Sequence, residues 1–265
     1  MRAAVLGSPV AHSLSPVLHT AAYRALGLSD WHYERHELDE AGLPGFVAGL
    51  MDDWAGLSLT MPLKRVALAV ADARSDLAVE VGAANTLVRS EAGWRAENTD
   101  VHGIIAALRE AGITMARTSL ILGAGGTAQA ALAALRELGE LRPTVLVRDP
   151  TRTTELRLAA GRLGVEPVIT GGLGEGPLPA ADLVISTLPA GAADALRGTA
   201  ADAVLDVVYA GWPTPFARTA RASGATIVSG LDMLLHQAAA QVELMTGRRA
   251  PLAAMRAALS QRRSR

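Results

Sequence analysis

The sequence predicts an α/β protein of two domains, each built around a mostly parallel sheet. Short apolar, β-branched segments alternate with Ala- and Leu-rich helical stretches along the whole chain, which is typical of strand–helix units. The chain has 265 residues, 50% of them hydrophobic and 26 of them glycine. This composition suits one large or two modest α/β domains.

The first domain is expected at the N-terminus. Its apolar runs predict strands at 2–6, 31–38, 54–60 and 85–88. A hairpin over 85–95 is expected to close the sheet. Helices are predicted at 16–26 and 40–50. Because the helix predicted at about 232–245 is expected to return here, the predicted boundaries are 1–100 plus 236–265.

The second domain is predicted over 101–235. A helix at about 101–111 has apolar residues at i, i+3 and i+4, and is expected to connect the domains. A buried strand at 119–122 and a long Ala-rich helix follow it. Further strands are predicted at 144–147, 165–169, 183–186, 203–207 and 226–228, with a surface loop at 171–179. Pro251 is expected to open a final helix.

Composition excludes several kinds of protein. With no cysteine, the chain has neither disulfides nor thiolate metal sites, and a net charge of −1 gives no general attraction to nucleic acid. The basic residues Arg262, Arg263 and Arg265 are read as a solvated tail. No apolar run is long enough for a membrane span, and the first one is too short for a signal peptide. We therefore expect a cytoplasmic monomer or homodimer without a metal site.

A dinucleotide motif follows the strand at 119–122. Gly123, Ala124, Gly125, Gly126, Thr127 and Ala128 form a G-x-G-x-x-A pattern that opens directly into a helix. The first glycine permits a tight turn, the second lets the backbone approach a pyrophosphate, and the small Ala128 permits close helix–sheet packing. This context predicts a Rossmann-type dinucleotide-binding domain.

The end of the next strand is expected to select the cofactor. Arg148 and Arg152 favour NADP, because an arginine there receives its extra phosphate, whereas Asp149 is suited to the ribose hydroxyls of NAD. The sequence therefore predicts NADP, with NAD as the less favoured alternative.

The first domain carries polar residues where its strands end. Ser13 and Ser15 follow the first strand, at the edge of a parallel sheet where ligands bind, although both hydroxyls are also suited to capping the next helix. Lys64 is the single lysine among 25 basic residues. Since arginine does not deprotonate near neutrality, this position is a candidate for a titratable amine.

The motifs together resemble the shikimate dehydrogenase family. Its patterns occur here in order: H-S-x-S-P at 12–16, T-x-P-x-K at 60–64, G-A-x-N-T at 82–86, N-T-D at 98–100 and G-L-x-M-L-x-x-Q at 230–237. The segment 206–209 with Thr214 and Pro215 is similar to the family's as well. The resemblance extends from Gly7 to Gly247.

This resemblance implies reversible NADPH-dependent reduction of 3-dehydroshikimate to shikimate, in aromatic amino-acid (chorismate) biosynthesis. It implies that Lys64 and Asp100 are catalytic and that the substrate contacts Ser13, Ser15, Thr60, Lys64, Asn85, Asp100, Tyr209 and Gln237. It adds Val207 and Gly230 to the cofactor site. The chemistry agrees, because hydride transfer to a ring ketone leaves an alkoxide that needs a nearby cation and a proton.

Some features leave alternatives open. Asp100 is also suited to capping the connecting helix, and Tyr209 to core packing. Ser58 stands where the family often has Asn, and Val147 weakens the NADP assignment. One alternative is a related dehydrogenase that prefers quinate and NAD, although Ser15 favours shikimate. A non-catalytic metabolite sensor is the other, yet it predicts loss of Lys64 or Asp100, and both are present.

Overall fold

The computed structural model describes residues 1–174, 177–196 and 200–263. Two compact units divide the chain: Met1–Gly103 with Leu234–Arg265, and Ile104–Met233. Each contains a six-stranded sheet in the described part of the chain. The α/β class expected from the sequence is therefore confirmed. Within the described residues, no helix has the length and apolar character required to cross a membrane.

The sheet of the first unit has the strand order β2-β1-β3-β5-β6-β4. Its strands are β1 (Arg2–Gly7), β2 (His32–Glu37), β3 (Trp54–Leu59), β4 (Ala73–Arg74), β5 (Thr86–Ser90) and β6 (Gly93–Glu97). Strand β1 pairs in parallel with both β2 and β3, whereas β5 runs antiparallel to β3 and β6. The central β3 is buried along its whole length, which explains its nearly continuous apolar sequence.

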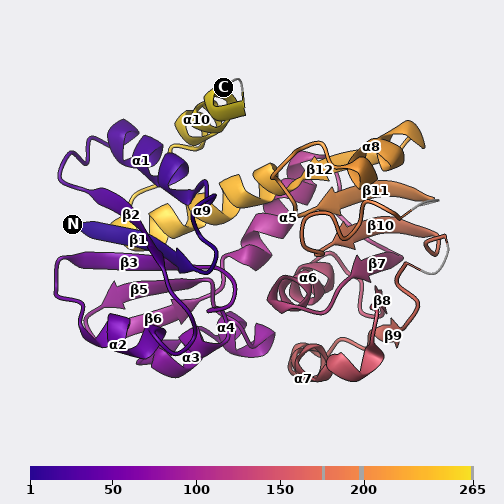
Figure 1. Cartoon of the computed structure of the whole chain (residues 1–265), viewed down its shortest axis with the longest axis horizontal. Helices are drawn as coiled ribbons and strands as arrows, with labels where there is room; N and C mark the ends of the chain where they lie inside the picture. The colour runs from indigo at the N-terminus through magenta and orange to yellow at the C-terminus, as the bar shows by residue number, and fades with distance from the viewer. Residues whose placement is uncertain (175–176, 197–199, 264–265) are drawn as a thin grey trace. The chain divides into compact units, whose positions relative to one another are not determined.

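Helices of the first unit are α1 (Ser15–Ala25), α2 (Leu43–Ala48), α3 (Val66–Val70), α4 (Asp76–Val81) and α10 (Leu252–Arg263). Helix α10 packs beside α1, which returns the C-terminal part of the chain to the first strands (Figure 1). The sequence did not predict β4, α3 or α4, because such short elements show too little periodicity. Helix α2 is shorter than predicted and begins beside Pro44.

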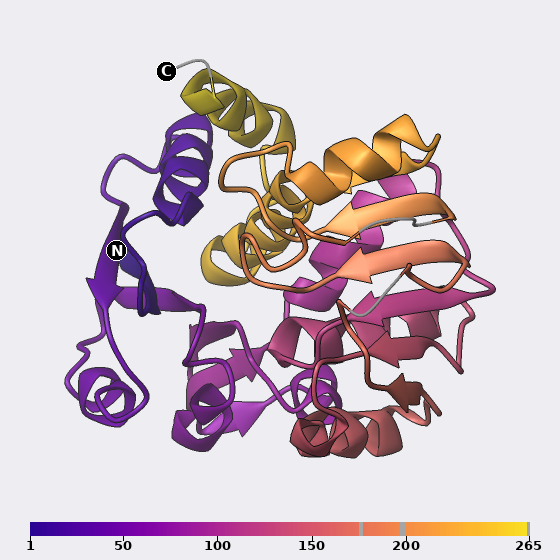
Figure 2. The ribbon, with the colours of Figure 1, turned by 45° about the vertical axis from the view of Figure 1, so that its right-hand side comes forward.

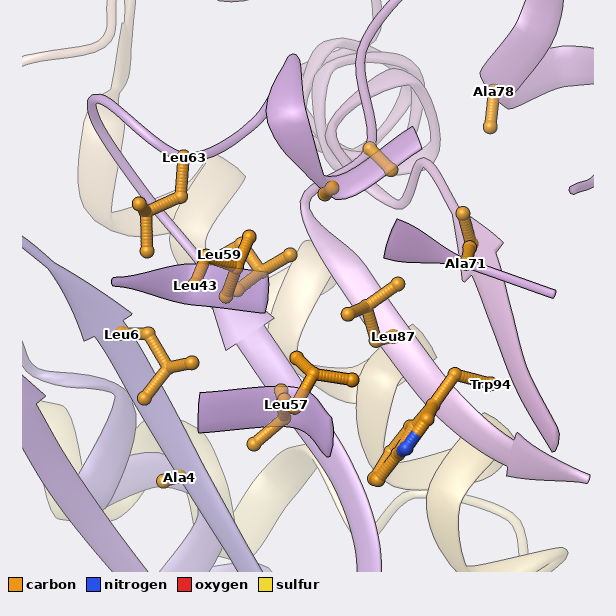
Figure 3. Close-up of a cluster of buried hydrophobic side chains, with 14 of the residues drawn as sticks. Ala4, Leu6, Leu43, Leu57, Leu59, Leu63, Ala71, Ala78, Leu87 and Trp94 are labelled. Carbon is orange, nitrogen blue, oxygen red and sulfur yellow. The ribbon is translucent and has the colours of Figure 1, made fainter. Parts of the chain in front are cut away.

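One face of this sheet covers a hydrophobic core. Leu6, Leu57 and Leu87, from three neighbouring strands, lie in one cluster of buried side chains (Figure 3). Leu63 belongs to the same cluster and is 0% exposed, although it lies in the turn after β3. Burying a leucine stabilises the folded chain by about 1.5–3 kcal/mol, so this turn is anchored to the core beside the residue that follows, Lys64.

The sheet of the second unit has the order β12-β11-β10-β7-β8-β9, and every pairing in it is parallel. Its strands are β7 (Ser119–Leu122), β8 (Thr144–Leu146), β9 (Val168–Thr170), β10 (Ala181–Ser186), β11 (Ala201–Asp206) and β12 (Thr226–Ser229). Strands β8 and β9 are added on one side of β7, whereas β10, β11 and β12 are added on the other side. Figure 2 shows this change of side as orange strands beside the magenta β7. This is the strand order of a dinucleotide-binding Rossmann fold.

The remaining helices are α5 (Asp100–Glu110), α6 (Gly126–Glu137), η1 (Pro150–Arg152), α7 (Thr154–Leu163), α8 (Pro215–Ala222) and α9 (Gly230–Thr246). Both boundaries between the units fall inside helices, namely α5 and α9. The sequence did not predict α7 or α8. Of the loop predicted at 171–179, residues 175–176 lie outside the described residues, as does Arg265 of the basic tail.

Candidate active site

A lysine and an aspartate form the centre of the candidate site in the first unit. Lys64 Nζ donates to Asp100 Oδ2 at 2.5 Å. The backbone holds Lys64 in place, since Ala84 N donates to its carbonyl at 2.7 Å. The Asp100 side chain is 6% exposed and that of Lys64 is 19% exposed. A charged pair is therefore kept largely from water, with the ammonium side still accessible.

The start of α5 is capped by Asn98. Its Oδ1 accepts from the backbone N–H of Asp100 at 3.0 Å and of Val101 at 3.4 Å. The capping role considered for Asp100 is therefore wrong, because Asn98 already satisfies the N–H groups that need a partner. The Asp100 carboxylate is left to face Lys64 and Asn85.

Asn85 connects Asp100 to Gln237. Thr99 N donates to Asn85 Oδ1 at 2.7 Å, and because a backbone N–H only donates, this contact fixes which way the amide points. The opposite atom, Nδ2, then lies 2.9 Å from Asp100 Oδ1 and 3.0 Å from Gln237 Oε1. Both Asp100 oxygens accordingly accept a hydrogen bond, one from Asn85 and one from Lys64.

The other predicted substrate residues of this unit lie at the ends of β1 and β3. Thr60 directly follows β3, and its N–H donates to Leu6 O at 2.9 Å. Ser13 Oγ donates to Ser15 Oγ at 3.2 Å, and the Arg35 guanidinium donates to the Ser13 carbonyl. Ser13 Oγ also accepts from the N–H of Ser15, the first residue of α1, at 3.3 Å, so the Ser13 hydroxyl supports the start of the helix, as considered from the sequence.

A group of buried polar residues beside this site was not predicted. Tyr33 OH donates to Ser58 Oγ at 2.6 Å, and Ser58 Oγ donates to Gln241 Oε1 at 2.8 Å. His19 stacks on Tyr33 and also contacts Gln241. Burial raises the pKa of Tyr33 well above its usual range, while Ser58, Ser15 and Arg35 oppose this in part. A signal was present in Ser58, a polar residue in an otherwise apolar strand.

The glycine turn of the second unit has the geometry expected for a phosphate. Gly123 has φ +103°, and a Cβ there would lie 2.7 Å from Thr187 Oγ1, so only glycine fits without a shift. Gly125 is the exposed N-cap residue directly before α6 and, being a glycine, brings no side chain to cap the helix. Gly126, Thr127 and the half-buried Ala124 lie in the same turn, with Ala128 fully buried. The first N–H groups of α6 therefore fit a pyrophosphate.

The cofactor-selecting residues lie after β8. Arg148 and Arg152 are both exposed. Asp149 Oδ1 accepts from Thr151 N at 2.9 Å and from Thr151 Oγ1 at 2.6 Å, so it caps η1. These hydrogen bonds lower the pKa of Asp149 below its usual value. The carboxylate that favoured NAD in the sequence is thus engaged by its own turn.

Val207 and Gly230 are neighbours in the second unit. A Cβ on Gly230 would overlap the Val207 carbonyl, so the backbones approach too closely for any other residue. The loop after β11 is held by the buried Asp206, which accepts from Thr214 Oγ1 at 2.7 Å. Tyr209, in this loop, is half-buried, and burial raises the pKa of its hydroxyl above the usual value. It therefore stays a proton donor at neutral pH.

A metal site finds no support in the part of the chain that the structure describes, where no group of three or more His, Asp or Glu side chains is suitably placed. His32 and His36 have the spacing of metal ligands on a helix, but they lie in strand β2, where His36 Nε2 contacts Glu34 Oε2 at 3.0 Å.

A doubly wound sheet with a glycine turn, together with a buried lysine–carboxylate pair in a separate α/β unit, defines a dinucleotide-dependent dehydrogenase class. Comparison with known proteins narrows this class. Residues 5–87 match the model of the shikimate dehydrogenase substrate binding domain, and residues 230–259 match that of the shikimate 5'-dehydrogenase C-terminal domain. The chain belongs to the shikimate dehydrogenase family.

Individual relatives extend over nearly the whole chain. Shikimate dehydrogenase (NADP(+)) of Anaeromyxobacter sp. (strain Fw109-5) is 40% identical over 266 residues, covering 97% of this chain and 94% of that protein. The crystal structure of Mycobacterium tuberculosis shikimate dehydrogenase is 47% identical, with a TM-score of 0.89 and coverage of 98% and 99%. Shikimate 5-dehydrogenase of Thermus thermophilus, solved with NADP(H) and shikimate, is 34% identical, with a TM-score of 0.84 and coverage of 98% and 99%.

Proposed function

We propose that this protein catalyses the reversible NADPH-dependent reduction of 3-dehydroshikimate to shikimate, in the pathway to chorismate and the aromatic amino acids. The observation that carries the proposal is the partly buried contact between Lys64 and Asp100, which Asn85 joins to Gln237. Membership of the shikimate dehydrogenase family and the glycine turn of the second unit support it.

Lys64 and Asp100 perform the proton transfer in this proposal. NADPH, when bound, would supply the hydride for the ring carbonyl carbon, whose oxygen then becomes negative. The Lys64 ammonium stabilises that oxygen and donates its proton to it. Asp100 accepts from the lysine at one oxygen, and so orients the ammonium while its charge balances it. In shikimate oxidation the neutral amine takes the hydroxyl proton back.

Substrate binding is assigned to polar groups of several elements. The Ser13 and Ser15 hydroxyls donate to the substrate carboxylate, next to the Arg35 charge. The ring hydroxyls are assigned to Thr60, Asn85 and Gln237, whose hydroxyl and amide groups both donate and accept. We assign Tyr209 to the substrate as well, with its hydroxyl as donor.

Cofactor binding is assigned to the second unit. The turn from Gly123 to Ala128 would hold the pyrophosphate, and the closely packed backbones of Val207 and Gly230 would also contact the cofactor. Arg148 and Arg152 receive the 2′-phosphate, because both are exposed cations after β8, while Thr151 engages one oxygen of Asp149. This arrangement favours NADP over NAD.

The proposed domains keep the boundaries expected from the sequence, with substrate binding at 1–100 and 236–265 and cofactor binding at 101–235. We further propose a cytoplasmic enzyme that is a monomer or a homodimer. Sedimentation velocity at several concentrations distinguishes these two states.

The first test is initial-rate oxidation of shikimate and of quinate, each with NADP and with NAD, followed by absorbance of the reduced nicotinamide. Strong preference for shikimate with NADP is the expected result. Preference for quinate or NAD would support the alternative dehydrogenase and keep the Lys64 chemistry. Absence of activity with all four pairs would favour the non-catalytic sensor.

A further inference from the structure

Gln241 is a buried polar side chain outside the proposed machinery. It is 1% exposed and lies on α9 one helical turn after Gln237. The burial of an amide is unfavourable unless its donors and acceptors are satisfied, so its partners define what it does.

The orientation of the Gln241 amide follows from one contact. Its Nε2 lies 3.2 Å from the Asn85 carbonyl oxygen, and since a carbonyl only accepts, the atom facing it must be the NH₂ group. The same Nε2 donates to Thr86 Oγ1 at 2.9 Å. Oε1 therefore points the other way, where it accepts from Ser58 at 2.8 Å and from His19 Nε2 at 3.3 Å.

These contacts place Gln241 between two groups of polar residues. On one side, Ser58 links it to Tyr33. On the other side, Gln241 contacts the backbone of Asn85, whose side chain donates to Asp100. The contacts of Gln241 thus lead, through Asn85, to the lysine–carboxylate pair.

Helix α9 makes two hydrogen bonds with Asn85. Gln237 accepts from its side-chain amide, while Gln241 donates to its backbone carbonyl. These two contacts from one helix add to the hydrogen bonds that Asn85 makes with Leu59 and Thr99. Loss of either contact leaves Asn85 less tightly held beside Asp100.

We propose that Gln241 is a positioning residue for dehydrogenation, which acts through Asn85 on Asp100. This inference rests on the proposed function. It does not assign Gln241 to the substrate or to the reacting atoms. A displacement of about 1 Å in such a supporting contact costs on the order of 100-fold in rate.

The test compares two variants of the full-length protein. Gln241→Leu removes all four hydrogen bonds. Gln241→Glu keeps the acceptors for Ser58 and His19 but sets a carboxylate oxygen against the Asn85 carbonyl, so it removes only the donor half. For both, initial rates at varied shikimate and varied NADP give kcat and the two KM values, and thermal unfolding gives Tm.

We expect kcat to fall and KM for shikimate to rise in both variants, with kcat/KM lowered by about 10- to 100-fold and KM for NADP unchanged. Wild-type kinetics in either variant would overturn the proposal. A lower apparent kcat with unchanged KM for shikimate would also overturn it. Partial unfolding gives that result, because it lowers the concentration of active enzyme and leaves the site of each folded molecule unchanged.

The matched control is Thr246→Val, on the same helix. Its hydroxyl donates to the Val242 carbonyl at 2.6 Å and accepts from the Arg248 N–H at 3.2 Å, so the variant removes hydrogen bonds at the end of α9, away from Asn85. This control is expected to lower Tm slightly and to keep both KM values. If the wild type fails to oxidise shikimate, the proposed function fails first, whereas an active wild type with unaffected Gln241 variants refutes this inference alone.

Discussion

Lys64 Nζ and Asp100 Oδ2 lie 2.5 Å apart, although 36 residues separate them in the chain. Lys64 is held in place by the buried Leu63 beside it, and Asp100 by the first turn of α5, whose cap is Asn98. Neither the burial of Leu63 nor the Asn98 cap depends on the contact between Lys64 and Asp100. The charges can therefore be altered singly without dismantling the elements that carry them.

Lys64→Ala is expected to lower kcat for shikimate oxidation by about 100- to 10,000-fold, because it removes both the proton donor and the nearby cation. NADP affinity should be almost unchanged, since the cofactor residues belong to the other unit. Steady-state rates and fluorescence titration with NADPH measure the two quantities. Near-normal turnover would refute the catalytic role.

Asp100→Asn tests the carboxylate, and Asn98→Ala tests the helix cap. Asp100→Asn is expected to lower kcat by on the order of 100-fold with little change in Tm, because Asn98 still caps α5. Asn98→Ala should instead destabilise the fold by about 1–3 kcal/mol and leave kcat within a small factor. Urea unfolding and initial rates on both variants separate the roles, and the reverse pattern would contradict them.

Arg148→Ala is expected to weaken NADP binding by about 10- to 100-fold, because a charge-assisted hydrogen bond contributes about 1.5–3 kcal/mol. NAD, which lacks the phosphate, should bind as before. KM for each cofactor measures the change. Arg142→Ala, an exposed arginine before β8 at the opposite end of the strand, is the control. Equal effects on the KM values for NADP and NAD would refute the assignment of Arg148 to the 2′-phosphate.

His19 makes stability depend on pH. Burial lowers its pKa to about 3, and the Gln241 hydrogen bond opposes this only in part. Above pH 6.5 the ring is neutral in both states. Between about pH 6.5 and 3 the unfolded chain binds a proton that the folded chain does not. The free energy of unfolding therefore decreases as the pH is lowered, by up to about 1.4 kcal/mol per pH unit.

The variant His19→Phe keeps a ring against Tyr33 and removes this titration. Urea unfolding at several pH values should therefore show a shallower decline for the variant than for the wild type. His32→Gln, on the exposed side of the edge strand, should keep the wild-type slope. Identical slopes in all three proteins would show that His19 does not titrate on unfolding.

Gly230→Ala is expected to lower Tm and to weaken NADP binding, because the added Cβ overlaps the Val207 carbonyl and pushes that backbone away. Gly161→Ala is the matched control in α7, where a Cβ meets nothing within 4 Å among the described residues. That change should stabilise the protein by about 0.5–1 kcal/mol. Similar behaviour of the two variants in thermal unfolding would contradict the close approach at Gly230.

Several features of the site were readable from the sequence because they are local. The glycine turn, the isolated lysine and the N-T-D segment each combine residue types within a few positions, and each directly follows or precedes a regular element. Strands with continuous apolar runs, such as β1, β3 and β7, were predicted for the same reason, whereas the two-residue β4 was not. The short α3 and α4 were not, because one or two turns carry no recognisable period.

What the sequence alone determined was therefore the α/β class, the glycine turn, the family and a set of polar residues at element ends. The tertiary structure decided how those residues divide their roles. Asn98 takes the cap and frees Asp100, Thr151 occupies Asp149, and Gln241 reaches Asn85 across 156 positions of the chain. Local patterns cannot specify such contacts, because strand register and helix packing determine which distant side chains meet, and competition among neighbouring donors and acceptors determines which pairs form.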